Sequence, residues 1–226
     1  MTEGQTGAGS GRTLLIGVLL CGVLLLGIVA LLMLRPQLMA ATATPTPTFA
    51  PDIPGVTPIE PGSDVADFTM ISSTGEPFDL SSLRGEYALL FFGYTHCPDF
   101  CPLTLSEFKQ VKSMLGEDAE RVNFIFITVD GERDTPEVLD RFVRRFDPEF
   151  IGLTPDEPTL EQIAPDYGLY YDRRTDEGSD GNYPVDHSTV SYLIDAQGKL
   201  RAIYSYDAEP EVIAEHVQGV MAGEGV

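Results

Sequence analysis

Two cysteines stand close enough in the sequence to act together on one partner atom. They are Cys97 and Cys101, in the segment HCPDFCP. A looped pair of thiolates can oxidise to a disulfide or hold one soft metal ion, and thiolates favour Cu(I) among the available metals. A purely structural disulfide is the other possibility in an oxidising compartment. The third cysteine, Cys21, lies in a long apolar run and is expected to act as a small apolar side chain.

The residues on either side of this pair predict a strand followed by a helix. The apolar run Tyr87 to Phe92 is typical of a strand buried on both faces, and Leu103 to Leu115 predicts a helix. Reactive thiols occupy this position in thioredoxin-like folds, where the helix N-terminus stabilises a thiolate. Because Pro102 would break a helix that began at Cys97, we expect the helix to begin near Pro102 and CPDFC to form a tight loop.

The rest of the chain after residue 64 alternates apolar runs with amphipathic segments, which is typical of an α/β sheet. A polar, Gly/Asp-rich stretch from Asp172 to Asp186 predicts a mobile surface loop. The other predicted elements are a hairpin (Asp67 to Ile71 and Pro77 to Leu80), strands at Val122 to Val129, Thr189 to Ile194 and Leu200 to Tyr204, a short segment of unassigned type at Phe150 to Leu153, and helices from Pro136 to Phe146, Thr159 to Tyr167 and Pro210 to Met221.

The N-terminal part of the sequence predicts a membrane anchor. No charged side chain interrupts Leu14 to Leu34, and at about 1.5 Å per residue this run spans a hydrocarbon core of about 30 Å. A cleaved signal peptide, with cleavage near Ala43, is the alternative, but the run exceeds the roughly 7–15 apolar residues of such peptides. We therefore expect a short tail at 1–13, a transmembrane helix at 14–34, and the soluble part outside the membrane.

The segment after the apolar run is rich in proline and threonine, so residues 35–63 are predicted to be a semi-rigid linker and residues 64–226 the folded domain. The N-terminus lacks the Arg-rich and Ser-rich character of an organelle transit peptide. This favours a single-pass protein of a bacterial plasma membrane with its domain on the extracytoplasmic side.

The charge of the chain excludes one class of partner. With 14 Lys and Arg against 35 Asp and Glu among 226 residues, the net charge is −21. Nucleic acid is not an expected partner, because the phosphate backbone attracts the opposite sign.

Four segments resemble the Sco/SenC family of copper-binding proteins: FFGYTHCPDFCPLTL, FITVDGERDTPEVL, GLTPDEPTLEQIA and YPVDHSTVSYLIDAQGKL. They occur in the family's order and cover roughly Val65 to Val220. The resemblance implies a thioredoxin-like α/β fold with a central mixed sheet flanked by helices. It also implies that Cys97, Cys101 and His187 bind copper, as Cu(I) or Cu(II). Gly131 and Pro155 depart from the family pattern, which usually has Pro and Gly there.

The choice of His187 among the three histidines also has a physical argument. His187 directly precedes a predicted strand, where thioredoxin-like folds usually carry a cis-proline facing the cysteines, and a histidine there would complete an S₂N site. His216 falls in the last helix and is expected at the surface, while His96 is expected to point away from the pair. For the second nitrogen of the His187 ring, the sequence offers a carboxylate acceptor. The candidates are Asp99, Asp130 and Asp186.

Two functions follow from the resemblance and the residues. The first is a membrane-anchored copper metallochaperone that helps to assemble the binuclear copper site of cytochrome c oxidase subunit II. The second is a thiol-disulfide oxidoreductase acting on an extracytoplasmic partner, in which Cys97 attacks and Cys101 resolves the mixed disulfide. A peroxidase is not expected, because Cys97 lacks the Pro-x-x-x-Thr lead of such enzymes.

Overall fold

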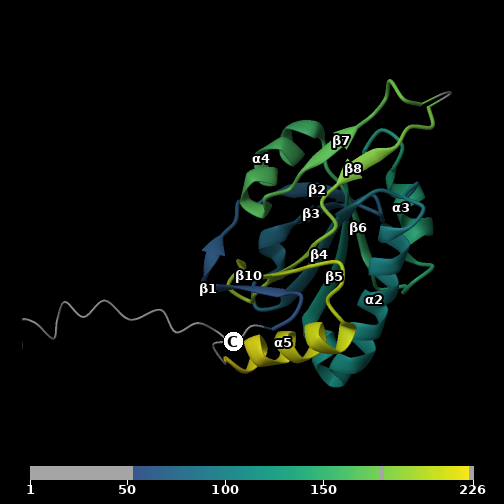
Figure 1. The fold of residues 1–226 in the computed structure, drawn as a ribbon. Coiled ribbons are helices and arrows are strands. Elements are labelled where there is room, and N and C mark those ends of the chain that lie inside the picture. The colour runs from purple at the N-terminus through teal and green to yellow at the C-terminus, as the bar shows by residue number, and fades with distance from the viewer. Residues whose placement is uncertain (1–52, 179–180, 224–226) are drawn as a thin grey trace, which may run out of the picture. The chain divides into compact units, whose positions relative to one another are not determined.

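The computed structural model describes residues 53–178 and 181–223, which form an eight-stranded mixed sheet, a separate two-stranded ribbon, and helices (Figure 1). The strand order of the large sheet is β1-β10-β9-β4-β5-β6-β2-β3, and β7 pairs with β8 in the ribbon. The strands are β1 (Val56–Asp64), β2 (Thr69–Ser72), β3 (Pro77–Asp79), β4 (Tyr87–Gly93), β5 (Val122–Thr128), β6 (Ile151–Thr154), β7 (Tyr171–Arg173), β8 (Val185–His187), β9 (Ser191–Ile194) and β10 (Lys199–Tyr204). The helices are α2 (Phe100–Leu115), α3 (Pro136–Val143), α4 (Glu157–Tyr167) and α5 (Pro210–Ala222), with short 3₁₀ turns η1 (Leu80–Leu83) and η2 (Gly116–Arg121).

The centre of the sheet is the parallel pair β4 and β5. Their register runs from Tyr87 opposite Val122 to Gly93 opposite Thr128, and every residue of β4 is buried. This burial on both faces explains the uninterrupted apolar sequence of the strand. Because β4 ends at Gly93, the residues that follow it emerge at the carboxyl end of the central strands, where the cysteines lie.

Helices cover both faces of the sheet. Phe108 of α2 contacts Phe124, and Phe142 of α3 contacts Phe126, so these two helices lie on one face of β5. Tyr167 of α4 contacts side chains of β4 and β9 that point to the other face. Helix α5 packs against α2 (Figure 1). The core is therefore shared between two apolar layers, as an α/β fold requires.

The sheet begins earlier in the chain than its proline content predicts. Residues 56–64, which the composition assigns to the linker, form the edge strand β1 and pair with β10. The pairing is interrupted between Pro58 and Ser63. An edge strand tolerates prolines because one side of its backbone has no ladder partner. The linker prediction is therefore wrong for residues 56–63.

The tail at 1–13, the transmembrane helix at 14–34 and the linker up to residue 52 all fall outside the described residues. Within residues 53–178 and 181–223, no helix has the length and apolar character needed to cross a bilayer.

Two further expectations are corrected. The stretch from Asp172 to Asp186, predicted to be a loop throughout, contributes residues to both strands of the β7–β8 ribbon, in which Tyr171 pairs with His187. A strand of three residues is too short to be recognised in the sequence by its alternation of apolar and polar residues. His216 is not a surface residue: it is 3% exposed, and its Nδ1 lies 2.8 Å from the hydroxyl of Tyr204. The apolar face of α5 thus includes a polar ring that packs against β10.

Candidate metal centre

Helix α2 places the second cysteine in its first turn. The helix begins at Phe100, two residues before Pro102, so the predicted loop is shorter than expected. Proline is tolerated at this position because the first backbone N–H groups of a helix have no intrahelical partner. Cys101 is consequently held by the helix, whereas Cys97 lies on the loop that enters it.

The structure brings together the three residues that the resemblance selects. The ligand atoms of Cys97, Cys101 and His187 all lie within 4.8 Å of one another, and Cys101 Sγ is 3.6 Å from His187 Nε2. Both thiols are free rather than joined in a disulfide. Metal–ligand bonds of about 2.0–2.3 Å place three ligands of one ion roughly 4 Å apart. The three atoms are therefore close to the spacing that one shared ion would require.

The imidazole of His187 is oriented for this role. Its Nδ1 donates to the backbone carbonyl of Ser188 at 2.8 Å, which leaves the lone pair of Nε2 directed toward the sulfurs. The rings of Phe91 and Tyr94 meet the imidazole edge-on, with centroids 5.9 and 5.7 Å away. The group that accepts the hydrogen bond from Nδ1 of His187 is thus a backbone carbonyl.

The three carboxylates proposed from the sequence do not hold this nitrogen. Asp186 pairs with Arg174, and Asp130 accepts from Tyr183 and Arg133. No hydrogen bond joins Asp99 to the ring in the described part of the chain. The expectation is wrong because β8 ends at His187, and the turn that follows places its own carbonyl beside the ring.

The two thiols differ in exposure and acidity. Cys101 is fully buried and Cys97 is 9% exposed. A hydrogen bond from the Cys101 thiol lowers the pKa of Cys97 to about 3, against the opposing effect of burial, and His187 lowers it further. Burial raises the pKa of Cys101, and the Cys97 thiolate beside it raises it further. The outer sulfur is therefore the thiolate, and the inner sulfur carries the proton.

Gly93 has a steric role that the sequence pattern did not reveal. A Cβ at this position would lie 2.6 Å from Cys101 Sγ and 2.9 Å from the Phe126 ring. The inner sulfur therefore packs directly against the backbone at the end of β4. Any larger residue here would displace Cys101.

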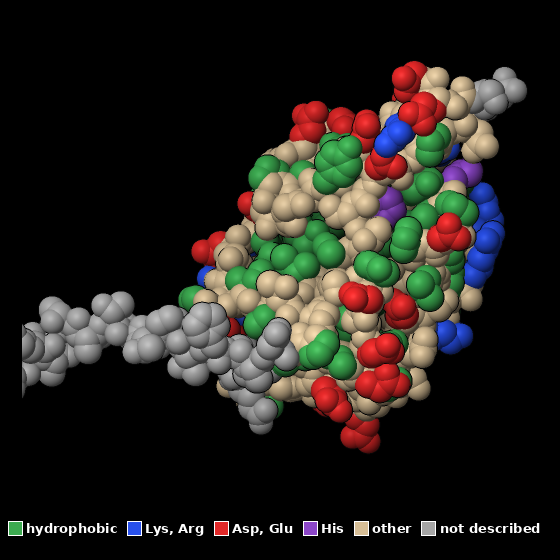
Figure 2. Space-filling model, viewed as in Figure 1, with side chains coloured by type: hydrophobic (Ala, Val, Ile, Leu, Met, Phe, Trp, Pro, Cys, Tyr) green, Lys and Arg blue, Asp and Glu red, His purple; other side chains and the backbone are tan. Residues whose placement is uncertain are grey.

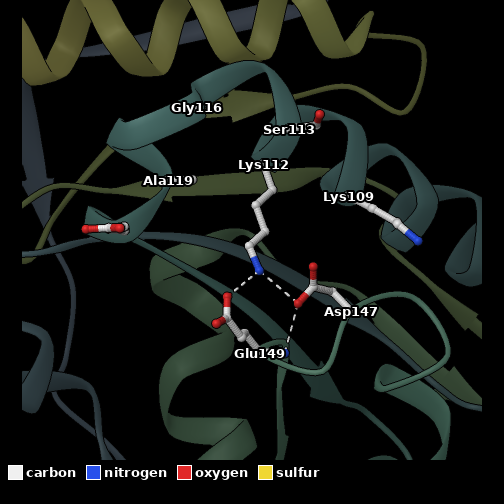
Figure 3. A pocket seen from close by; sticks show the side chains of 8 residues that line it. Lys109, Lys112, Ser113, Gly116, Ala119, Asp147 and Glu149 are labelled. Carbon is white, nitrogen blue, oxygen red and sulfur yellow. Dashed lines mark hydrogen bonds and ion pairs between the residues drawn. The ribbon is translucent and has the colours of Figure 1, made fainter.

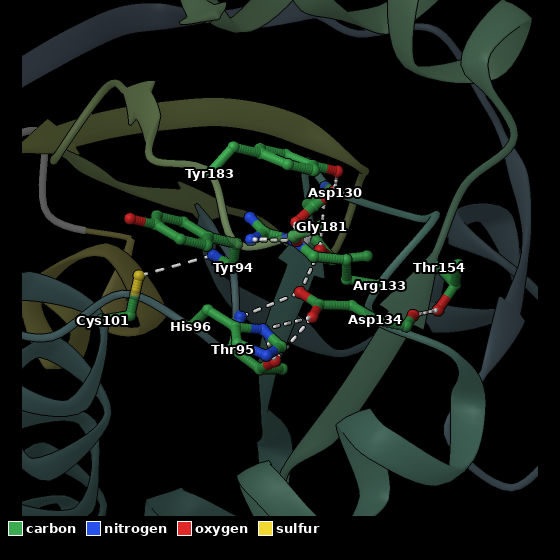
Figure 4. A network of polar contacts seen from close by, with 11 residues as sticks. Tyr94, Thr95, His96, Cys101, Asp130, Arg133, Asp134, Thr154, Gly181 and Tyr183 are labelled. Carbon is green, nitrogen blue, oxygen red and sulfur yellow. Dashed lines mark hydrogen bonds and ion pairs between the residues drawn. The ribbon is translucent and has the colours of Figure 1, made fainter. Parts of the chain in front are cut away.

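One loop, Asp130 to Asp134, holds both halves of the site (Figure 4). On the cysteine side, the buried carboxylate of Asp134 accepts from the backbone N–H of Thr95 at 2.8 Å and from its hydroxyl at 2.5 Å. The same carboxylate accepts from the hydroxyl of Thr128 at 2.6 Å. Asp134 thus fixes the chain two residues before Cys97.

On the histidine side, the same loop holds the chain four residues before His187. The Tyr183 hydroxyl donates to the buried Asp130 at 2.7 Å, and the Arg133 guanidinium lies 3.6 Å from the centre of the Tyr183 ring. Arg133 itself donates to Asp130 at 2.5 Å. These contacts attach the β7–β8 ribbon, and with it His187, to the end of β5 (Figure 4).

We expect Asp134→Asn to lower the free energy of unfolding by about 2 kcal/mol, because a buried carboxylate that accepts three hydrogen bonds would be replaced by a neutral amide. Urea unfolding measures this. Asp156→Asn is the matched control: Asp156 caps α4 by accepting from the Thr159 N–H, and asparagine caps helices about as well. Equal stability of parent and Asp134→Asn would contradict the prediction.

We expect Tyr183→Phe to weaken metal binding roughly 10-fold. The substitution removes the hydrogen bond from Tyr183 to Asp130, which holds β8 and His187 in place, and it changes no metal ligand. Competition with a Cu(I) chelator measures the change. Tyr170→Phe, at an exposed tyrosine just before β7, should bind as the parent does. If both variants bind like the parent, the hydroxyl of Tyr183 does not position His187.

His96 is not part of the cluster, as expected. Its Nδ1 lies 3.2 Å from the Thr95 hydroxyl and 3.7 Å from Asp134, and its side chain is 49% exposed. The residues that sequence reasoning missed are Gly93, Arg133, Asp134 and Tyr183. All four lie inside the quoted family segments, but nothing in their spacing distinguishes support of a site from ordinary packing.

The two cavities near α2 differ in chemistry. The cavity over the cluster, of about 440 Å³, is lined by Cys97, Phe100 and His187 among others. A cavity of about 470 Å³ near the end of α2 is lined by lysine, acidic and small residues (Figure 3). There Lys112 pairs with Asp147 at 2.8 Å and with Glu149 at 2.6 Å, and no sulfur or imidazole lines the space. Only the first cavity offers soft-metal ligands.

The fold and the site together define a thioredoxin-like protein with a Cys-Cys-His group at the start of the helix that follows a central strand. A family model described as SCO1/SenC matches residues 57–222. The chain belongs to the SCO1/SenC family.

Relatives of known sequence and structure agree with this. The SCO2-like protein of Rickettsia felis is 37% identical over 153 residues, which cover 68% of this chain and 75% of that protein. The structure of Bradyrhizobium japonicum ScoI with copper bound has a TM-score of 0.63 and 35% identity, and the match covers 69% of this chain and 98% of that one. Arabidopsis thaliana ScoI with copper bound gives 0.66 and 30%, covering 71% and 99%.

Proposed function

We propose that this chain binds one copper ion through Cys97, Cys101 and His187 and passes it to a copper-free cytochrome c oxidase subunit II. The observation that carries the proposal is the convergence of two sulfurs and one imidazole nitrogen within 4.8 Å, beside a cavity that Cys97 and His187 line. Two soft thiolates with one imidazole suit Cu(I), and the imidazole also suits Cu(II). The copper-bound ScoI structures of relatives support the choice of metal.

The residues of this chain would supply three functions in copper transfer. Cys97, the outer thiolate, would be the first sulfur that a partner's sulfur replaces, because it is the more exposed of the two thiols. Cys101 would lose its proton when copper binds, since a thiolate is the metal ligand. His187, held by Ser188, would contribute a neutral nitrogen donor.

The test is transfer of copper from the loaded full-length chain to a copper-free, reduced subunit II fragment, followed by the absorption of the binuclear copper centre. We expect transfer from the parent and none from His187→Ala. If the parent retains its copper in the presence of excess reduced acceptor, the metallochaperone proposal fails.

A second function, reduction of the acceptor's cysteines, is favoured by the difference between the two thiols. An acidic, accessible Cys97 beside a buried, protonated Cys101 is the arrangement of an attacking and a resolving thiol. Incubating the reduced chain with the oxidised subunit II fragment would test it. His187→Ala should keep this activity and lose copper transfer, which separates the two functions.

The N-terminal run at 14–34 completes the proposal as a single membrane anchor that holds the domain outside a bacterial plasma membrane. We expect the chain to stay with membranes after alkaline extraction and its domain to be digested by protease added to spheroplasts. A chain that alkaline treatment releases would contradict the anchor.

A further inference from the structure

Three large apolar side chains are exposed beside the mouth of the metal cavity. Phe100 is 43% exposed, Leu103 50% and Tyr206 56%. Phe100 lines the cavity, and its ring meets the Tyr206 ring edge-on at 5.8 Å, while Leu103 lies one turn further along α2. These three residues, the apolar strip, therefore continue the site onto the surface. Exposed apolar patches of this kind mark contact surfaces.

Acidic side chains border the strip. They are Asp99, Glu107, Asp207 and Glu209, and none of them pairs with Lys or Arg within residues 53–178 and 181–223. Burial and the charge of Glu209 raise the pKa of Glu107 to about 6, so at neutral pH this border carries charges that repel each other. Figure 2 shows acidic side chains gathered over α5, while most of the Lys and Arg side chains in this view lie toward its right-hand edge.

We propose that the apolar strip is the docking face for a protein partner that presents a cysteine beside an apolar side chain and flanks them with Lys or Arg. This rests on the proposed function, since the docked cysteine would be the one that accepts copper or exchanges thiols. The apolar centre supplies contact area, and the unpaired carboxylates attract a cationic rim and speed its approach. A second copy of this chain does not fit, because two acidic rims would face each other.

The test uses the reduced full-length chain in detergent, in a Cys21→Ser background, and three synthetic peptides of equal length. Each peptide carries one cysteine as a mixed disulfide with nitrothiobenzoate. One places Leu beside the cysteine with Lys on both flanks, the second keeps Leu but has Glu flanks, and the third keeps Lys flanks but replaces Leu by Ser. The Cys97 thiolate attacks the peptide sulfur, a new S–S bond forms, and the coloured nitrothiobenzoate thiolate leaves with the electron pair of the broken bond.

We expect the Leu/Lys peptide to react about 10-fold faster than the Leu/Glu peptide at low salt. The ratio should approach one near 1 M salt, where the screening length falls to about 3 Å. The Ser/Lys peptide should react several-fold more slowly than the Leu/Lys peptide. Equal rates for all three peptides would overturn the proposal.

Variants locate the effect on the strip. Leu103→Ser and Tyr206→Ser should each slow the Leu/Lys peptide about 3-fold or more, and Glu107→Gln with Glu209→Gln should reduce the preference for Lys flanks. Met114→Ser is the control: Met114 is 41% exposed on the same helix, about 16 Å further along. Every variant should react with uncharged hydroxyethyl disulfide at the parent rate, which shows that Cys97 is intact.

Three outcomes would count against the proposal. The first is an equal loss in Met114→Ser and Tyr206→Ser. The second is a loss with hydroxyethyl disulfide as well as with the peptides. The third is a concentration-dependent dimer that Tyr206→Ser abolishes, which would assign the strip to self-association. Copper titration tests the proposed function separately from the docking face. If the chain prefers the Leu/Lys peptide but binds no copper, the docking face stands and the proposed function fails.

Discussion

His187→Ala is expected to bind Cu(I) at least roughly 100-fold more weakly than the parent. Loss of even a supporting residue of a metal site costs about 10–100-fold, and here the only nitrogen of the three-atom group is removed. The fold should persist, because the imidazole is anchored by a backbone carbonyl rather than by a buried side chain. Anaerobic competition with a chromogenic Cu(I) chelator gives the affinity, and urea unfolding checks the fold.

His96→Ala is the matched control for this variant. It removes an imidazole next to Cys97 in sequence, but that ring contacts Thr95 and Asp134 instead of the sulfurs. We expect its affinity to stay within about 3-fold of the parent, well inside the cost of even a supporting residue. If His187→Ala binds like the parent, or if His96→Ala loses as much as His187→Ala, then the imidazole near the sulfurs is not the ligand.

Alkylation of the reduced chain by iodoacetamide is expected to be nearly independent of pH between 5 and 8. An ordinary thiol, with a pKa near 8.5, gains about tenfold in thiolate per pH unit over this range, about 1000-fold in all. Cys97 has a pKa of about 3 and is therefore already a thiolate at pH 5. Lowering the pH therefore reduces the rate of alkylation only when the pH approaches the lowered pKa of Cys97.

The measurement is done in a Cys21→Ser background, so that only the two thiols of the site are counted. One thiol per chain should react at pH 5, and Cys97→Ser should abolish this reaction, because burial keeps the Cys101 thiol protonated. Cys101→Ala should restore a pH-dependent rate, since the hydrogen bond that lowers the pKa of Cys97 is lost. A rate that rises tenfold per pH unit in the parent would show that Cys97 is an ordinary thiol.

Much of the fold follows from local patterns. The run YALLFF predicts β4 and VNFIFITV predicts β5, because a strand covered on both faces has no polar positions. Thr135-Pro136 marks the start of α3 correctly, whereas its predicted end at Phe146 is three residues too late. Phe146 still packs against the core after the helix has ended. Its apolar character therefore indicates that the side chain is buried, and does not indicate that the residue is helical. In the same way, the proline-rich composition of residues 56–63 predicts a linker, although these residues form most of β1.

The amino-acid sequence alone predicts the α/β class, the strand–cysteine–helix order, and a soft-ligand chemistry for Cys97 and Cys101. These are local properties, set by residue type and by periods of two or 3.6 residues. Which sulfur is buried, that the carbonyl of Ser188 orients His187, and that one loop supports both halves of the site became evident only from the folded chain. These depend on contacts such as that between Cys101 and His187, 86 residues apart, which the pairing of strands creates and no local period encodes.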